Sequence, residues 1–452
     1  MATSEADLWK TFANKLMKSF TVGQDIGPKN RIYIPLLNST TIPAGNNVSP
    51  AITNYGVARV GDSLLNVDNP MFVPSTDTYA KRCLQYLRAV YLITDSSIGS
   101  AHVVEERKAK MDKAEEDFFK VQAKMKKYWE ESGDNSTFVD WVSHHSGTYS
   151  AAKKARDGAT AKYFQALTEV DGVGAQDLLE AIRRLEAAIG DEVSDLYNME
   201  VSSERLGSTP TAAPKQRAPK YVIDSTYAQV LQNWASTVLD DNVVNGQKVV
   251  ISFDSTQTGE YSWESLGHTT NKVDAKATFL PFFRVEYAYK GSTQRKEVKA
   301  SEFKDKVGFE LSANGLRAFS IGPDSSWDPG NVQKRFQRLF PNSPPSLSEP
   351  MVMVTNIVVG WKVAFKITMG QDLFNKITSD IEEASKHDAN ASATLFGFRL
   401  GLTASGKHDE GNSTKWSDVQ KNNGNYEMVI PASTDNTPVL LAAFGTVLSK
   451  DS

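Results

Sequence analysis

The chain has 452 residues, of which 40% are hydrophobic and 23% charged, and its formal net charge is −4 at pH 7. This length exceeds the size at which one hydrophobic core usually keeps growing, so we expect two or three domains. Binding to a phosphate backbone needs a basic surface, and the slightly acidic balance therefore argues against a nucleic-acid partner. No stretch reaches the roughly 18 uninterrupted apolar residues of a membrane span, which excludes an integral helical membrane protein.

Two features of the sequence bear on the compartment. Residues Met1–Glu5 lack the basic and then apolar pattern of a secretory signal. The single cysteine, Cys83, excludes an internal disulfide and fits a reducing compartment. We therefore expect a cytoplasmic protein, with release by a non-classical route left open.

Residues 1–102 predict an N-terminal helix followed by an irregular, partly β segment. In the helix, Leu8, Phe12 and Leu16 recur at helical spacing and mark an inner face. A short apolar strand is expected at 31–37. Because strand-like sequence lies on both sides of the helices that follow, we expect this region to pack on the later β body, with the helical unit inserted between.

Residues 103–203 predict a hairpin-like unit of three helices. Every seventh residue from Val104 to Met125 is apolar, the spacing of a coiled-coil seam, and the pattern returns from Leu178 to Met199 with Glu192 as its single polar residue. An alanine-rich helix between them can be approached closely by its neighbours. Gly and Asn at 132–135 and 172–174 predict the two chain reversals. The first helix should be roughly 40 Å long and project from the body.

Beyond the helices the period changes from seven to two. Residues 204–220 hold three prolines and few large apolar side chains, the composition of a linker. Alternating apolar and polar residues then predict a first β-rich region at 221–345 and a second at 346–452.

Individual strands can be read within both β-rich regions. Phe283–Tyr289 should turn at Gly291 into a polar partner strand, and we expect single strands at 361–368 and 396–402. The expected fold class is α+β: an antiparallel β-sandwich-like body with an inserted or projecting unit of long, amphipathic, coiled-coil-like helices.

The sequence offers no strong catalytic, metal or cofactor motif. Its six histidines form no HExxH or HxH pattern. Asp140, His144 and His145 lie close in sequence, but such a trio is common by accident, so no metal is expected. Gly401–His408 approaches a phosphate-binding loop but has His408 where the motif needs a hydroxyl, and no helical pattern follows. We therefore expect no cofactor.

Aromatic residues on two amphipathic helices are the interaction candidates. They are Trp9 and Phe12 in the first helix, and Phe118, Phe119, Tyr128 and Trp129 in the long helix. Such residues can enter a bilayer or fill a partner's groove. The alternative is that they pack the protein's own core, which a single apolar stripe normally indicates. Phe119 and Trp129 lie off the predicted seam and are the residues that best separate the two interpretations.

The sequence thus predicts a non-enzymatic protein that acts through association. It would be membrane-active in the manner of a pore former, or self-assembling as a homo-oligomer, with the helical unit as the interaction element; a lipid surface is the other possible partner. One alternative is an enzyme of unfamiliar type with a pocket between sheet and helices, using some of His102, His144, His145 and His268. A second alternative is a structural or storage protein. These assignments are architectural analogies, because fold alone does not fix function.

Overall fold

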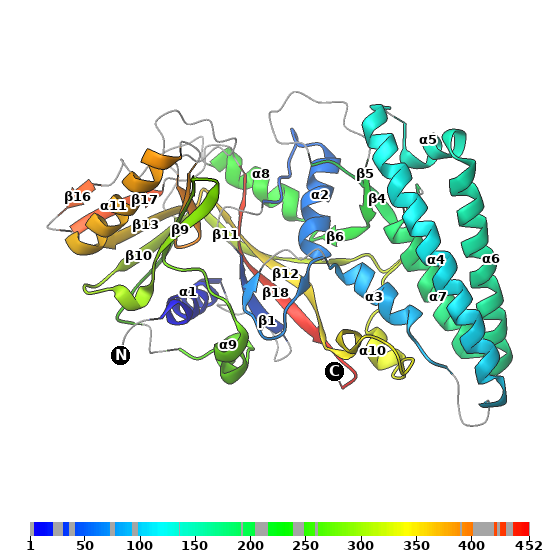
Figure 1. Ribbon diagram of the computed structural model, residues 1–452. Helices are drawn as coiled ribbons and strands as arrows, with labels where there is room; N and C mark the ends of the chain where they lie inside the picture. The colour runs from blue at the N-terminus through cyan, green and yellow to red at the C-terminus, as the bar shows by residue number, and fades with distance from the viewer. Residues whose placement is uncertain are drawn as a thin grey trace.

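Figure 1 shows the computed structural model of the chain, a mixed α+β protein with several antiparallel sheets. It describes residues 4–20, 30–35, 41–72, 77–92, 98–134, 136–190, 193–203, 216–237, 248–257, 261–388, 391–400, 420–422, 425–430 and 437–451. The predicted α+β class is confirmed.

A seven-stranded sheet runs through the centre of the molecule. Its strand order is β3 (Met71–Phe72), β1 (Asn30–Pro35), β18 (Val439–Leu448), β12 (Met351–Trp361), β11 (Gly315–Pro323) and β6 (Tyr221–Ile223), with β2 (Leu64–Leu65) also paired to β12. All pairings are antiparallel except that of β1 with β3. Strand β1 lies beside β18, so the first and last described strands of the chain share one sheet.

Two further sheets complete the β body. The five-stranded sheet has the order β16 (Gln420–Asn422), β17 (Asn425–Ile430), β13 (Ala364–Met369), β10 (Gly308–Ala313) and β7 (Val249–Asp254). The four-stranded sheet has the order β15 (Phe398–Leu400), β14 (Ser392–Leu395), β8 (Phe283–Tyr289) and β9 (Ser292–Val298). The β8–β9 hairpin is confirmed: Lys290 and Gly291 form its two-residue turn with φ of 50° and 80°.

The central and five-stranded sheets are joined where one long hairpin changes sheets. One arm of this hairpin runs from β10 into β11, and the other runs from β12 into β13. Strands β10 and β13 pair in the five-stranded sheet, whereas β11 and β12 pair in the central sheet. The chain bends at Asn314, whose N–H donates to the Trp361 carbonyl at 2.9 Å, and at Lys362, which has a φ of 45°. Of the single strand predicted at 361–368, residues 364–368 are confirmed as part of β13, but Trp361 ends β12, because the left-handed Lys362 divides the two strands.

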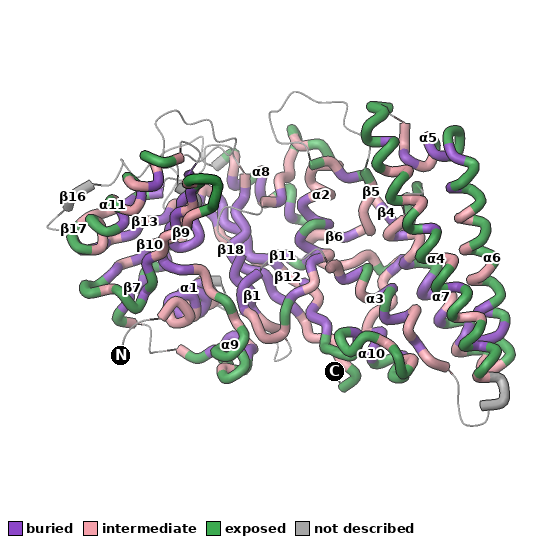
Figure 2. Tube along the Cα trace, viewed as in Figure 1, coloured by how far each residue is buried: buried purple, intermediate pink, exposed green. Residues whose placement is uncertain are grey.

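Each face of the central sheet packs on a different core. Neighbouring residues of one strand, such as Val358 and Val359, point to opposite faces, as the pleat requires. One core lies between the sheets, together with α1 (Glu5–Phe20) and α11 (Gln371–His387). The other lies under α2 (Pro50–Gly61), α3 (Tyr79–Arg88), α8 (Tyr227–Thr237) and α10 (Val332–Arg335). Figure 2 shows the central strands almost entirely buried.

Four helices, which we call the helical layer, form the side of the molecule at the right of Figure 1. They are α4 (Ile98–Ser132), α5 (Phe138–His145), α6 (Gly147–Val170) and α7 (Gly172–Ile189). Helix α6 packs on α4, α5 and α7, and α7 also packs on α3. The remaining helix, α9 (Thr270–Lys276), lies below β1 in the same view.

The third predicted helix is shorter than its heptad pattern. It ends at Ile189 because the side chain of Asn198 turns back and donates to the Ala187 carbonyl at 2.9 Å. The proposed seam beyond this point is wrong: Leu196 is 56% exposed, and Met199 lies in strand β4 (Asn198–Val201). Part of the predicted linker is β5 (Gln216–Pro219), which pairs with β4.

Candidate interaction site

The two aromatic candidates of the first helix lie in the core between the sheets. Trp9 and Phe12 are fully buried. The Trp9 ring stacks on the Phe396 ring, with centroids 4.3 Å apart and planes at 11°. A surface role for Trp9 and Phe12 would require α1 to leave the core, so the structure places them as packing residues instead.

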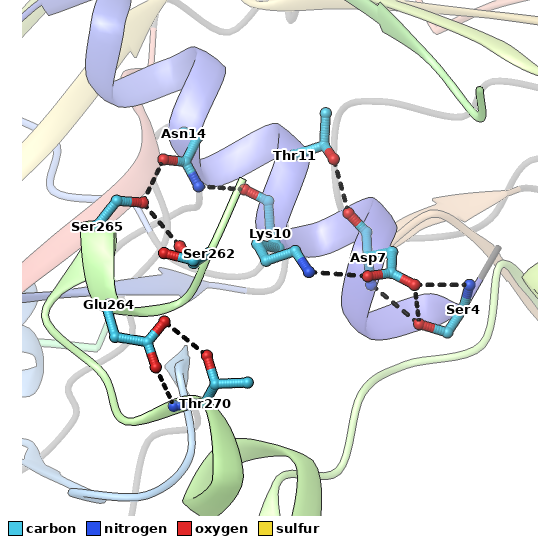
Figure 3. A network of polar contacts seen from close by, with 9 residues as sticks. All are labelled: Ser4, Asp7, Lys10, Thr11, Asn14, Ser262, Glu264, Ser265 and Thr270. Atoms are coloured by element: carbon cyan, nitrogen blue, oxygen red, sulfur yellow. Dashed lines mark hydrogen bonds and ion pairs between the residues drawn. The ribbon is translucent and has the colours of Figure 1, made fainter. Parts of the chain in front are cut away.

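Helix α1 is also held on its polar side, as Figure 3 shows. The Ser4 hydroxyl accepts from the Asp7 N–H at 3.2 Å and so caps the helix start. The Ser265 hydroxyl donates to Asn14 Oδ1 at 2.8 Å and ties the helix to the segment before α9. In that segment, Glu264 accepts from the Thr270 hydroxyl at 2.7 Å, and such bonds hold the pKa of the Glu264 carboxyl well below its usual range.

Two of the four aromatic candidates of α4 form a small separate core with α5 and α6. The Phe118 ring lies 5.4 Å from Tyr149, and the Trp129 ring lies 5.8 Å from Phe138. Trp129, which lies off the predicted seam, is thus a packing residue in the structure. The predicted seam residue Tyr128 is exposed in its place, because the 25 residues from Val104 to Trp129 make about seven whole turns of a straight α-helix.

The other two aromatic candidates of α4 remain on the surface. Phe119 and Tyr128 are each 45% exposed. They are nine residues apart, about two and a half turns, and therefore lie on opposite sides of the helix. The guanidinium of Arg88 lies 6.0 Å from the Phe119 ring, and the Lys124 ammonium lies 5.7 Å from the Tyr128 ring. The two exposed rings do not form one apolar patch.

A groove of about 480 Å³ lies between α4 and α6. Its apolar lining consists of small side chains: Ala109 and Ala114 from α4, and Ala152 and Ala155 from α6. Its rim is charged and comes from α4: Glu106, Lys110, Lys113 and Asp117. The rim pairs within the helix, Lys110 with Glu106 at 2.5 Å and Lys113 with Asp117 at 3.0 Å. The alanine-rich pattern of α6 predicted the close approach of a neighbouring helix, and Ala114 of α4 belonged to the predicted seam, whereas Ala109 was not predicted to line a contact.

The middle of α4 is fixed to α3 and α7 by a half-buried ion-pair cluster. Arg88, at the end of α3, contacts the carboxylates of Glu115 from α4 and Glu186 from α7, the latter at 2.8 Å. Burial raises the pKa of Glu115, and the Arg88 charge opposes that shift. One cation thus joins three helices at the point where the helical layer meets α3.

The four histidines proposed for catalysis are not brought together. His102 lies at the start of α4, whereas His144 and His145 are exposed on α5, and their Nδ1 atoms contact carbonyls of their own helix. His268 is 2% exposed, and its Nε2 donates to the Ile32 carbonyl at 2.8 Å; burial lowers its pKa to about 4. Among the described residues, no three His, Cys, Asp or Glu side chains gather as a metal site.

A buried cluster of ionisable groups lies at the start of α3. Its members are Asp62, Tyr79, Cys83, Tyr221 and Asp328. Asp62 accepts from the Ala80 N–H at 2.9 Å and from the Tyr221 hydroxyl at 2.8 Å, while burial raises its pKa to about 6. Burial also raises the pKa of the Cys83 thiol, which disfavours the reactive thiolate. These contacts connect structural elements and form no open site.

A second, polar hollow of about 270 Å³ lies on the outer face of the five-stranded sheet. Its lysines are already paired, Lys306 with Asp254 at 2.8 Å and Lys366 with Glu310 at 3.5 Å. The loop-like sequence at 401–408 lies outside the described residues.

Comparison with known proteins found no protein similar to this chain. No family model matches the chain, and no curated protein and no solved structure matches it. Within the described part of the chain, no helix has both the length and the apolar character needed to cross a membrane.

Proposed function

We propose that this protein acts by association, without catalysing a reaction, and that the helical layer is its interaction element. The observation that carries the proposal is the alanine-lined groove between α4 and α6. A solvent-facing helix surface is normally covered by long polar side chains. Here Ala109 and Ala155 are exposed instead, and an alanine loses no side-chain rotamer freedom when a partner covers it.

The shape and lining of the groove favour a helix over a small molecule as its occupant. Small-molecule sites usually enclose their ligand and aim a few polar groups at it. The apolar lining of this groove consists of alanines alone, and the charged side chains that also line it are exposed and paired within α4. An amphipathic helix laid along two others presents the complementary surface.

Membrane activity and catalysis have less support. Four of the six aromatic candidates for bilayer insertion are buried, namely Trp9, Phe12, Phe118 and Trp129. The exposed face of α4 carries both charge signs in i, i+4 pairs such as Lys120–Glu116 and Lys127–Glu131, which suits contact with water or protein. The enzyme alternative has less support, since His102 lies on α4, the exposed His144 and His145 lie on α5, and the buried His268 lies before α9.

Amide hydrogen exchange at low and high protein concentration tests the proposal. We expect exchange in α4 and α6 to slow as concentration rises, because a docked partner suppresses local opening of the covered helices. The buried strands β12 and β18 serve as the internal control, since their exchange should not depend on concentration. Concentration-dependent protection confined to the β sheets, with none in α4 or α6, would contradict the proposal.

A further inference from the structure

We infer that the partner at the groove is a second copy of the chain, whose own α4–α6 face docks antiparallel about a two-fold axis. This inference rests on the proposed function and specifies its partner. In such an isologous contact each copy supplies the same surface, and α4 and α6 of both copies form a four-helix layer. The contact closes on itself and yields a dimer.

The charges at the rim carry the inference. Along α4 they read acid, base, base, acid at Glu106, Lys110, Lys113 and Asp117. When two antiparallel copies meet with the axis between Ala109 and Lys110, Glu106 of each copy faces Lys113 of the other. The aliphatic stem of each Lys110 then covers the partner's Ala109, while its ammonium stays in water.

Neighbouring registers are less favourable. With the axis midway along the groove, between residues 111 and 112, Glu106 would face Asp117 and Lys110 would face Lys113, so all rim contacts would join like charges. With the axis between Lys113 and Ala114, opposite charges meet again, but Lys120 would face Arg107. Among these three registers, charge complementarity therefore favours the one centred between Ala109 and Lys110.

The available area agrees with a stable dimer. Helix α6 has 24 residues and is about 36 Å long, and two adjacent helices present a strip roughly 20 Å wide. Their common face is thus about 700 Å², near the ~800 Å² that each partner contributes to a standard-size interface. The small side chains allow helix axes to approach closely, which improves packing over that strip.

Charge exchange between copies tests the inference. Glu106→Lys and Lys113→Glu each place like charges at both symmetric contacts, and we expect the dimer dissociation constant to rise about tenfold in either variant. In an equimolar mixture of the two variants, the lysine introduced at position 106 of one copy would face the glutamate introduced at position 113 of the other. The second contact keeps the original Glu106 and Lys113, so the mixed dimer should regain an affinity close to that of the unchanged protein.

Sedimentation velocity measures the unchanged protein, each variant and the mixture. Lys127→Glu, at an exposed position outside the groove, is the matched control and should not change the dissociation constant.

The outcomes separate the inference from the proposed function. If the unchanged protein associates but neither charge variant weakens it, the groove is not the dimer contact, while association itself stands. If both variants weaken association and the mixture does not restore it, the antiparallel register is wrong. If the unchanged protein is monomeric at every concentration, the proposed function fails together with the inference.

Discussion

Trp9→Ala is expected to lower the free energy of unfolding by about 3–5 kcal/mol, the range for truncating a buried aromatic side chain. The substitution removes the ring stacked on Phe396 and leaves a cavity between the sheets. Phe396 itself has a φ of 45° in the turn between β14 and β15, so the surrounding rings must hold it there. Urea unfolding followed by far-ultraviolet circular dichroism measures the loss.

Phe119→Ala is the matched control for this prediction. Phe119 is 45% exposed on α4, so its truncation should cost less than about 1 kcal/mol. A small loss from Trp9→Ala, comparable with that from Phe119→Ala, would mean that α1 is not packed between the sheets, and the surface interpretation of Trp9 would return.

Arg88→Met should weaken the attachment of the middle of α4 to α3 and α7. The substitution keeps a long side chain but leaves Glu115 and Glu186 without their shared cation. We expect a loss of about 2 kcal/mol at pH 7, below the roughly 3–5 kcal/mol of a fully buried pair because water screens this half-buried cluster. Hydrogen exchange of the α4 amides, together with urea unfolding, measures the effect.

The loss from Arg88→Met should depend on pH with a definite sign. The pKa of Glu115 is already raised in the folded state, so its contribution to stability is fully present below its unfolded pKa and is lost as pH rises. Removing Arg88 raises that folded pKa further, and the defect should therefore be larger at pH 7 than near pH 4. Arg184→Met, which breaks the exposed pair with Glu180, is the control and should cost less than about 0.5 kcal/mol at either pH. A loss of stability from Arg88→Met that is the same at pH 7 and pH 4 would show that removing the Arg88 charge does not destabilise the ionised carboxylates.

Local periodicity predicted the elements whose burial follows from one strong pattern. The spacing of Leu8, Phe12 and Leu16 predicted α1, and the alternation in 283–289 with Gly291 after it predicted the β8–β9 hairpin. The apolar face of α1 and the turn of the β8–β9 hairpin are each encoded within a few neighbouring residues. The α+β class followed from the change of period between these segments.

Patterns failed where a distant contact or an unusual backbone decided the structure. Lys362 and Phe396 both have positive φ, a conformation that the sequence signals through Gly or Asn rather than through these residue types. The strand predicted at 361–368 is consequently divided, and the one predicted at 396–402 begins only at Phe398, after a turn at Phe396 and Gly397. Beyond Ile189 apolar residues continued at heptad spacing, but Gly190 and the turn at Asn198 ended the helix.

The candidate site was the least predictable part. An amphipathic pattern marks an apolar face but does not say what covers it. The pattern therefore left Trp9 as a surface candidate, whereas in the structure its ring packs on Phe396. The groove depends on alanines of two helices lying side by side, Ala109 with Ala155 among them, and only the α6 half of that pattern stood out. Three-dimensional packing, rather than any motif, defines this site.

The molar mass of the purified protein by light scattering, over a range of concentrations and with or without anionic lipid vesicles, tests the central claim most directly. We predict a reversible increase from the 49.7 kDa chain to a dimer as concentration rises, with no dependence on lipid. A chain that remains monomeric throughout, or that assembles only when vesicles are present, would contradict association through the helical layer.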